Sequence, residues 1–241
     1  MLEAAFWGFV GGAALLIGAA VGLARPFPPR VIGLIMGFGA GVLISAVAFE
    51  LTKEAFDRSG TDAVVGGLAA GALTFFAGDW LIDRRGGDNR KRSGGQQQSD
   101  AGTALALGGL LDGIPESVAI GATLLGGGKI GVAVVAAVFL SNFPESLSSS
   151  VGMRKAGHSS RYILALWAGV LLASTLAAAI GYATLDGAPD VTIALIQGFA
   201  AGAILVMLSD TMVPEAVGEG GSVVGLVTTA GFVLAFLLSN A

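Results

Sequence analysis

The chain has 241 residues and a net charge of −4, and only 12% of its residues are charged while 54% are hydrophobic. A soluble domain carries about a quarter charged residues, so this composition excludes an ordinary water-soluble fold. The acidic balance also argues against nucleic acid as a partner. The 39 glycines follow no three-residue period, which excludes collagen and leaves a membrane protein with closely packed helices.

Eight apolar stretches are long enough to cross a bilayer, whose hydrocarbon core of about 30 Å needs about 20 helical residues. Charged, proline-rich or glycine-rich segments separate them, and no room is left for a soluble domain. We therefore predict one all-α, polytopic transmembrane domain over residues 1–241, a multi-pass protein in the lipid bilayer of the cell membrane. The expected spans cover residues 5–24, 31–51, 62–82, 102–125, 129–151, 161–183, 191–213 and 222–240.

Lysine and arginine residues are divided unequally between the two sides of this arrangement. Ten follow the first, third and fifth spans, whereas Lys53, Arg58 and Lys129 follow the second and fourth. The positive-inside rule places the ten in the cytoplasm, so both termini are expected to face outward. The long polar stretch at residues 84–100, RRGGDNRKRSGGQQQSD, is predicted to be a flexible cytosolic loop.

An internal similarity indicates a transporter. Residues 37–55, GFGAGVLISAVAFELTKEA, share six identities with residues 198–216, GFAAGAILVMLSDTMVPEA, at an offset of 161. The second and seventh spans are expected to cross in opposite directions, which predicts an inverted repeat in a 3+2+3 arrangement, a common design among secondary transporters. The glycine-rich second, third and seventh spans also permit close packing between protomers, which leaves a homodimer open.

Three acidic residues, Asp112, Glu116 and Glu145, lie near the middle of their expected spans, where none of the 13 basic residues falls. A charge at the bilayer centre costs at least about 2.5–3.5 kcal/mol, so these carboxyls are either protonated or compensated by a cation. Other ionisable residues lie at helix ends or in a loop, and their roles stay open: Glu50, Asp79, Asp210 and the single histidine, His158.

The spacing of these residues favours a cation. Asp112 and Glu116 are four residues apart, as are Ser141 and Glu145, so each pair shares one face of a helix. The segments DGIPES and SNFPES, which begin at residues 112 and 141, also place a proline inside each helix, which frees a backbone carbonyl about one turn earlier. Carboxylates, the Asn142 amide, a hydroxyl and free carbonyls are oxygen ligands that suit a divalent cation.

These two segments resemble the motifs of the ZIP (Zrt/Irt-like) family of divalent metal transporters, whose fourth and fifth helices carry His-Asn-x-Pro-Glu-Gly type sequences. Family members resemble this chain in having eight spans, outward termini and a variable cytosolic loop after the third span. The resemblance implies that Glu116 and Glu145 are metal ligands, together with Asp112 and Asn142. Ser141 matches a further ligand position and is the poorest donor of the set.

The chain departs from the family pattern at three positions of the first motif, the third being Ser117 in place of the final glycine. Asp112 stands where the family usually has histidine, and Gly113 stands in place of the motif asparagine. The remaining donors are all oxygen atoms, which suit harder ions such as manganese, whereas imidazole suits zinc, copper and iron. The expected substrate is therefore a divalent cation, zinc by family resemblance, with manganese and iron left open.

We predict ZIP-type transport of this cation towards the cytoplasm by alternating access, with the metal held between the fourth and fifth helices as substrate and no catalytic cofactor. The resemblance implies that the first, fourth, fifth and sixth helices move against the other four. An enzyme is not expected, because no base lies near a nucleophile in any span. The alternatives are a metal sensor or structural protein of the same fold that transports nothing, and a proton-linked carrier.

Overall fold

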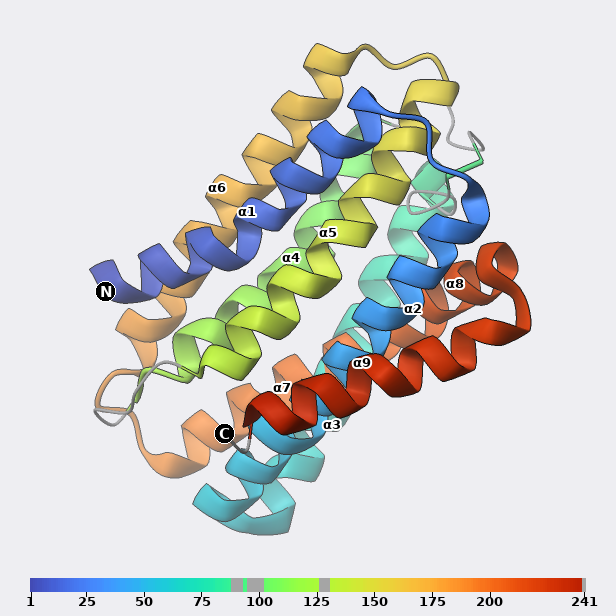
Figure 1. Cartoon of the computed structure of the whole chain (residues 1–241). Helices are drawn as coiled ribbons and strands as arrows, with labels where there is room; N and C mark the ends of the chain where they lie inside the picture. Colours follow the sequence, from blue (N-terminus) through green and yellow to red (C-terminus); the bar gives the residue numbers. More distant parts are fainter. Residues whose placement is uncertain (88–92, 95–101, 126–130, 240–241) are drawn as a thin grey trace.

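The computed structural model describes residues 1–87, 93–94, 102–125 and 131–239, and every regular element in these ranges is helical (Figure 1). The helices run side by side as a bundle. In chain order the elements are α1 (Leu2–Ala24), α2 (Pro29–Ala46), η1 (Val47–Thr52), α3 (Lys53–Ile82), η2 (Asp83–Gly87), α4 (Gly102–Ala122), α5 (Val132–Lys155), α6 (Ser160–Leu185), α7 (Asp190–Met207), η4 (Leu208–Met212), α8 (Val213–Gly220), η5 (Gly221–Val223) and α9 (Val224–Ser239).

Six helical runs among the described residues are long and apolar enough to cross a membrane. Four of them, in α1, α4, α5 and α6, have 18 to 26 residues, which matches about 20 residues for one crossing. The other two, Pro29–Gly87 and Asp190–Ser239, have 59 and 50 residues and are far longer than one crossing requires. The chain is therefore an all-α, polytopic membrane protein, which confirms the predicted class.

Each long run folds back at a glycine. Gly60 has φ 72° and ψ −167°, and Gly221 has φ 74° and ψ −161°. A residue with a side chain is strained at such a positive φ, whereas glycine adopts it freely. The chain therefore reverses at these two points, and α3 and α9 return along the bundle (Figure 1).

The two long runs are also built alike, element by element. α2 begins at Pro29 and α7 at Asp190, an offset of 161 (190 minus 29), and their last residues, Ala46 and Met207, keep the same offset. The π-helical segments η1 and η4 follow directly, and the two reversing glycines again stand 161 residues apart. The sequence similarity thus marks part of a longer structural repeat.

Glycines let the paired helices of the two runs approach to backbone contact. A Cβ atom added at Gly41 of α2 would lie 1.8 Å from the carbonyl oxygen of Thr228 in α9. A Cβ at Gly202 of α7 would lie 2.1 Å from the carbonyl oxygen of Leu68 in α3. Small residues serve helix association in membranes in this way. The structure uses these glycines within one chain, so they give a homodimer no support.

The remaining long helices, α1, α4, α5 and α6, form a second group. α1 packs against α5 and α6, and α4 packs against α6. Here too the backbones are close, since a Cβ at Gly18 of α1 would lie 2.2 Å from the carbonyl oxygen of Phe143 in α5. The two groups meet where α2 contacts α5 and where α7 contacts α4.

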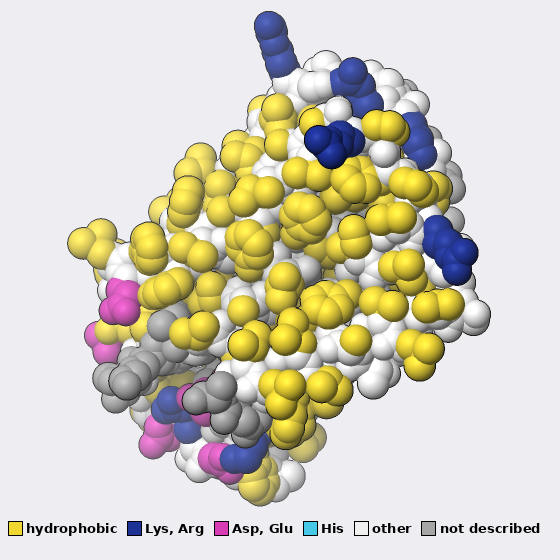
Figure 2. Space-filling model, viewed as in Figure 1, with side chains coloured by type: hydrophobic (Ala, Val, Ile, Leu, Met, Phe, Trp, Pro, Cys, Tyr) yellow, Lys and Arg dark blue, Asp and Glu magenta, His cyan; other side chains and the backbone are white. Residues whose placement is uncertain are grey.

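The surface is divided by charge. Figure 2 shows a broad apolar middle, basic side chains gathered at one end of the molecule, and acidic side chains with a few basic ones at the other. An apolar middle between two charged ends is the surface that a membrane-spanning protein requires.

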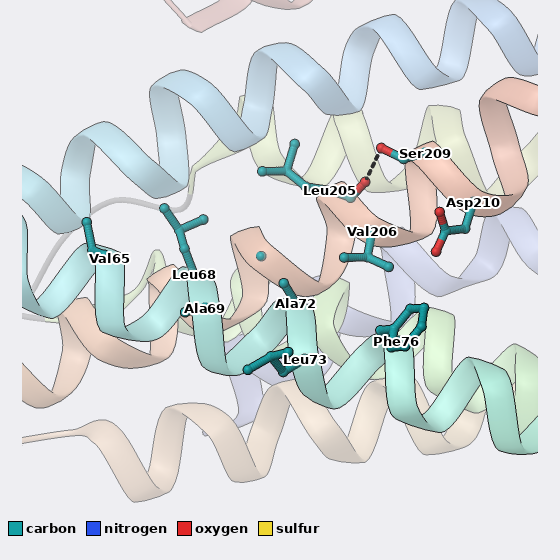
Figure 3. A pocket seen from close by; sticks show the side chains of 11 residues that line it. Val65, Leu68, Ala69, Ala72, Leu73, Phe76, Leu205, Val206, Ser209 and Asp210 are labelled. Atoms are coloured by element: carbon teal, nitrogen blue, oxygen red, sulfur yellow. Dashed lines mark hydrogen bonds between the residues drawn. The ribbon is translucent and has the colours of Figure 1, made fainter.

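An open apolar groove runs between α3 and α7 and has a volume of about 740 Å³ (Figure 3). Leu68, Ala72 and Phe76 line one wall, and Val206 lies on the other, with Asp210 at the end of the groove. A polar hollow of about 390 Å³ adjoins this end and is lined by three acids, Asp79, Asp83 and Asp210, with Phe76, Trp80, Ser209 and Thr211.

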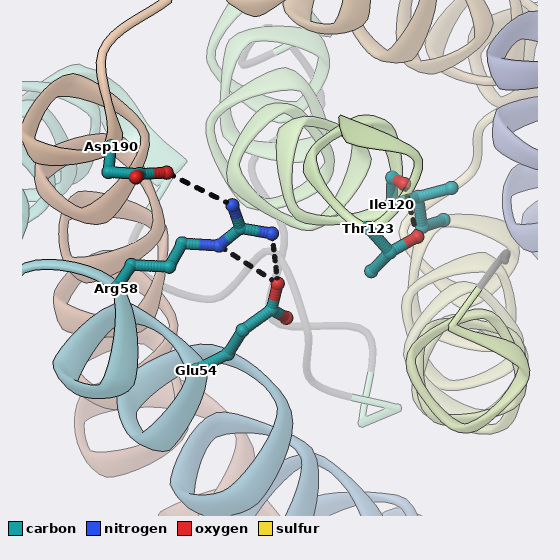
Figure 4. A network of polar contacts seen from close by, with 5 residues as sticks. All are labelled: Glu54, Arg58, Ile120, Thr123 and Asp190. Atoms are coloured by element: carbon teal, nitrogen blue, oxygen red, sulfur yellow. Dashed lines mark hydrogen bonds and ion pairs between the residues drawn. The ribbon is translucent and has the colours of Figure 1, made fainter. Parts of the chain in front are cut away.

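Arg58 connects the two long runs through a small ionic network (Figure 4). Its guanidinium donates to Oε1 of Glu54, with Nη2 at 2.7 Å, and its Nη1 lies 3.5 Å from Oδ1 of Asp190 at the start of α7. The Arg58 side chain is 22% exposed, so solvent screens these pairs.

We expect Arg58→Ala to lower the free energy of unfolding by less than about 1 kcal/mol, the usual value of a partly exposed ion pair. Thermal unfolding of the purified protein in detergent measures this change. The matched control is Lys53→Ala, because Lys53 forms a more exposed ion pair with Asp57. This variant is expected to lower the free energy of unfolding even less than Arg58→Ala. A loss of several kcal/mol in Arg58→Ala would contradict the expectation.

Candidate metal centre

The five predicted ligands lie on α4 and α5 and are all buried. Their exposed fractions are 3% or less: Asp112 3%, Glu116 1%, Ser141 0%, Asn142 3% and Glu145 2%. Each helix continues through its internal proline, Pro115 in α4 and Pro144 in α5. The sequence pattern therefore places both motifs on long helices inside the bundle.

A hydrogen bond joins the two motifs directly. The Ser141 hydroxyl donates to Oε1 of Glu116 at 3.3 Å and also lies 3.0 Å from the carbonyl oxygen of Val138. Among the described residues, however, no group of three or more acidic, histidine or cysteine side chains is gathered closely enough to hold one metal ion. The structure thus brings Glu116 and Ser141 together but does not assemble Asp112, Glu116 and Glu145 into one cluster.

Asn142 connects the site to α1. Its Nδ2 donates to the carbonyl oxygen of Gly11 at 3.3 Å. One turn later, the Ser146 hydroxyl lies 2.9 Å from the carbonyl oxygen of Asn142 and 3.4 Å from that of Ala14. These contacts fix the rotation of α5 about its own axis relative to α1. They therefore determine the direction in which the acid-bearing face of α5 points.

Helices of the two repeats flank the site. A Cβ at Gly39 of α2 would lie 3.0 Å from the carbonyl oxygen of Leu140 and 3.2 Å from the Cα atom of Ser141. The equivalent residue in the second repeat is Ala200, because 200 minus 39 is again 161, and it is buried in α7, which contacts α4. Each repeat therefore supplies one helix that contacts one of the two site helices, α2 against α5 and α7 against α4.

The structure explains why Gly113 stands where the family motif has asparagine. A Cβ at this position would lie 2.8 Å from the hydroxyl oxygen of Ser174 in α6 and 3.6 Å from a methyl group of Val170. A side chain at this position would therefore need the Ser174 hydroxyl to turn aside. Gly113 faces α6 and contributes to helix packing.

Ser93 is part of the predicted flexible loop at residues 84–100, most of which lies outside the described residues. Ser93 itself is fully buried. Its backbone nitrogen donates to Glu215 at 3.2 Å, its hydroxyl donates to Glu219, and its carbonyl oxygen accepts from Lys155 Nζ at 2.8 Å. This point of the loop is thus held between α8 and the end of α5.

The other polar residues left open by the sequence lie outside α4 and α5. Asp79 and Asp210 border the polar hollow at the end of the groove between α3 and α7. Glu50 lies in η1, outside α4 and α5. The imidazole of His158 is stacked on Tyr162, with ring centroids 5.2 Å apart, in the connection between α5 and α6.

The fold and the site together define a polytopic helical membrane protein with buried acidic and amide side chains on two of its helices. The model of the family described as ZIP Zinc transporter matches residues 82–239, more than half of the chain. The chain therefore belongs to the ZIP zinc transporter family. This membership confirms the resemblance inferred from the two motifs, and it places the chain in a family of transporters rather than enzymes.

The chain is also similar to a protein of Arabidopsis thaliana that is described as a candidate zinc transporter. The two are 29% identical over 216 residues, which cover 85% of this chain and 34% of the relative. The chain thus spans about a third of the length of that protein.

Proposed function

We propose that the protein carries a divalent metal cation across the membrane towards the cytoplasm by alternating access. The metal is the substrate, and it is held by Asp112, Glu116, Asn142 and Glu145, with Ser141 as the weakest donor. The observation that carries the proposal is the direct hydrogen bond between Ser141 and Glu116, which places the two motifs face to face inside the bundle.

The chemistry of these side chains favours a cation as their ligand. Three carboxyl groups lie deep in α4 and α5, and none of the 13 basic residues of the chain falls in the middle of either helix. Ionised carboxyls in such a place are costly unless a cation compensates them. Carboxylate, amide and hydroxyl oxygens are suitable ligands for a divalent ion.

Metal binding then requires a rearrangement, because the three carboxyls do not form one cluster in the described conformation. The arriving ion replaces the hydrogen bond between Ser141 and Glu116 and draws α4 and α5 together. A site that is assembled in one conformation and open in another is what alternating access needs.

We propose eight membrane crossings in a 3+2+3 arrangement, with both termini outside. Each long run contributes two crossings, which is supported by the reversals at Gly60 and Gly221 and by the common offset of 161 residues. The orientation is supported by the excess of basic residues after the first, third and fifth spans. The cell membrane is the proposed location.

The two groups of helices are the proposed moving parts. α1, α4, α5 and α6 move as one body against α2, α3, α7 and α9, and the surfaces between them are those of α2 with α5 and α7 with α4. Gly39 makes the surface between α2 and α5 smooth, because glycine has no side chain that would interlock with the neighbouring helix.

Zinc is the first candidate substrate, by family and by the description of the Arabidopsis relative. Manganese or iron is the alternative supported by the donor set, because Asp112 replaces the usual histidine and leaves only oxygen ligands.

Uptake into proteoliposomes tests the proposal. The purified protein is reconstituted, and Zn, Mn, Fe, Cd, Co and Mg are compared with protein-free vesicles. We expect saturable uptake of at least one ion, with zinc or manganese taken up fastest. Equilibrium binding without flux would replace the proposal with a metal sensor, and proton movement without metal uptake would replace it with a proton-linked carrier. If the protein showed neither metal binding nor metal flux, the proposal would be replaced by a structural protein that transports nothing.

A further inference from the structure

Gln197 of α7 is a buried amide that neither motif explains. It is fully inaccessible to solvent, and neither its Nε2 nor its Oε1 atom has a hydrogen-bond partner among the described residues. Buried amides in proteins are almost always hydrogen-bonded, and an exception calls for a functional or structural reason. An ion or its hydration water, present during transport, would supply the partner that this amide lacks.

The helix packing directs Gln197 towards the interior of the bundle. Gly198 and Gly202 lie about 100° to 140° around α7 from Gln197, at 3.6 residues per turn. Cβ atoms added at these glycines would lie 3.0 Å from Val64 O and 2.1 Å from Leu68 O in α3, so α3 covers a different face of α7 from the one that carries Gln197. Gln197 is four residues after Ile193 and so shares its face. Ile193 belongs to the same buried cluster as Ala122 and Leu125 at the end of α4.

The same contacts give the depth of Gln197 in the membrane. In the proposed topology α7 runs inward while α4 runs outward, and Ile193 packs at the outer end of α4. Gln197 lies about 6 Å along α7 from Ile193, and Glu116 lies about 9 Å along α4 from Ala122, at a rise of 1.5 Å per residue. Gln197 is therefore close to the level of Glu116, on its outer side.

The repeat shows that an amide is not needed here for packing. The equivalent residue in α2 is Met36, because 197 minus 36 is 161, and Met36 is also fully buried. In the proposed topology Met36 lies on the cytoplasmic side of the site and Gln197 on the outer side. Of these two equivalent positions, only the one on the outer side of the site therefore carries a polar side chain.

We propose that Gln197 lines the outer access route and offers its amide oxygen to the incoming divalent cation before Glu116 binds it. This inference rests on the proposed transport function and adds to it a residue that sets the affinity for the ion. An amide oxygen replaces one water of the hydration shell without adding charge, so the ion is attracted but not trapped.

The test is Gln197→Met, which gives α7 the side chain of its repeat partner at similar volume. We expect the metal concentration for half-maximal uptake to rise by about tenfold, the usual effect of losing one hydrogen bond to a charged group, while the maximal rate changes less. The melting temperature is expected to stay the same or to rise, because a buried amide without a partner has been removed.

Trp167→Phe is the matched control. The indole nitrogen of Trp167 is another buried donor without a hydrogen-bond partner among the described residues, and it lies in a separate cluster with Leu105 and Ile163. This variant is expected to transport like the unaltered protein. If removal of any buried donor changed uptake equally, the assignment of Gln197 to the route would be wrong.

Gln197→Glu supplies the second measurement. It keeps an oxygen ligand and adds charge, so we expect uptake to be retained with a lower half-saturating concentration at neutral pH. Unaltered half-saturation in both Gln197 variants would overturn the inference while leaving the transport function intact. The transport function itself fails only if the unaltered protein takes up no metal, which is a different result on the same preparation.

Discussion

Glu116→Ala and Glu145→Ala are each expected to abolish saturable metal uptake, with a loss of at least about 100-fold. Mutating a residue that hydrogen-bonds to a metal ligand, without binding the metal itself, costs about 10- to 100-fold in metal affinity or activity. Removal of a ligand is expected to cost no less. Both side chains are buried, at 1% and 2% exposure, so water does not readily replace the lost oxygen atoms. Initial uptake rates in proteoliposomes measure the effect.

Two comparisons make this result specific. Glu3→Ala removes an acid from the first turn of α1, outside the α4–α5 motifs, and is expected to leave uptake unaltered. Ser141→Ala removes the weakest donor and the hydrogen bond to Glu116, and is expected to reduce uptake less than either glutamate variant. Uptake close to that of the unaltered protein in both glutamate variants would refute the assigned site, even if the protein transports metal.

Gly41→Ala and Gly202→Ala are expected to destabilise the fold severely, each by about 3 kcal/mol or more, at the upper end of the range for overpacked sites. The added methyl groups would lie 1.8 Å and 2.1 Å from backbone oxygen atoms of the facing helices. A backbone oxygen cannot rotate aside as a side chain can, so whole helices must separate. Thermal unfolding in detergent and the yield of monodisperse protein report the loss.

The control for this prediction is Gly169→Ala in α6. No atom of the described residues lies within 4 Å of an added Cβ at this position, and its backbone is helical. Alanine is favoured over glycine in helices by about 1 kcal/mol, so this variant is expected to be neutral or slightly stabilising. Equal stability of the Gly41, Gly202 and Gly169 variants would show that the helix pairs have room that the structure does not indicate.

Most of the helical elements could be predicted from apolar run length, because the thickness of the bilayer sets how many residues a helix needs. The boundaries were less predictable. The expected span 31–51 consists of α2 and the π-helical η1, and the expected span 62–82 is the second part of α3, which begins at Lys53. A hydropathy profile does not show where an α-helix changes to π-helical geometry. It also does not show that a helix extends several residues beyond its apolar stretch, up to a reversing glycine.

The candidate site was predictable in its residues but not in its geometry. Asp112, Glu116, Ser141 and Glu145 were identified by their spacing of four, which any α-helix converts into a shared face. The spacing along one helix contains no information on the distance to another. Only the packing of α4 against α5 decided that Glu116 meets Ser141 and that the described residues form no cluster of all three carboxyls.

Gln197 was missed because it is uncharged and lies outside the two motifs that the mid-span acids mark. The signal was present as an amide inside an apolar stretch, since an intramembrane polar residue is costly and rarely idle. Its lack of a hydrogen-bond partner among the described residues became visible only once α7 was seen packed on α3.

Composition and patterning alone determined that this protein is helical, lies in a membrane and carries two related acidic motifs, because these properties depend on run length, charge scarcity and helical periodicity. The tertiary structure decided which glycines join which helices, that the repeat extends to its π-helical segments and reversing glycines, and which ligands are in contact. Those features depend on side chains far apart in the chain, whose meeting is determined by the packing of whole helices.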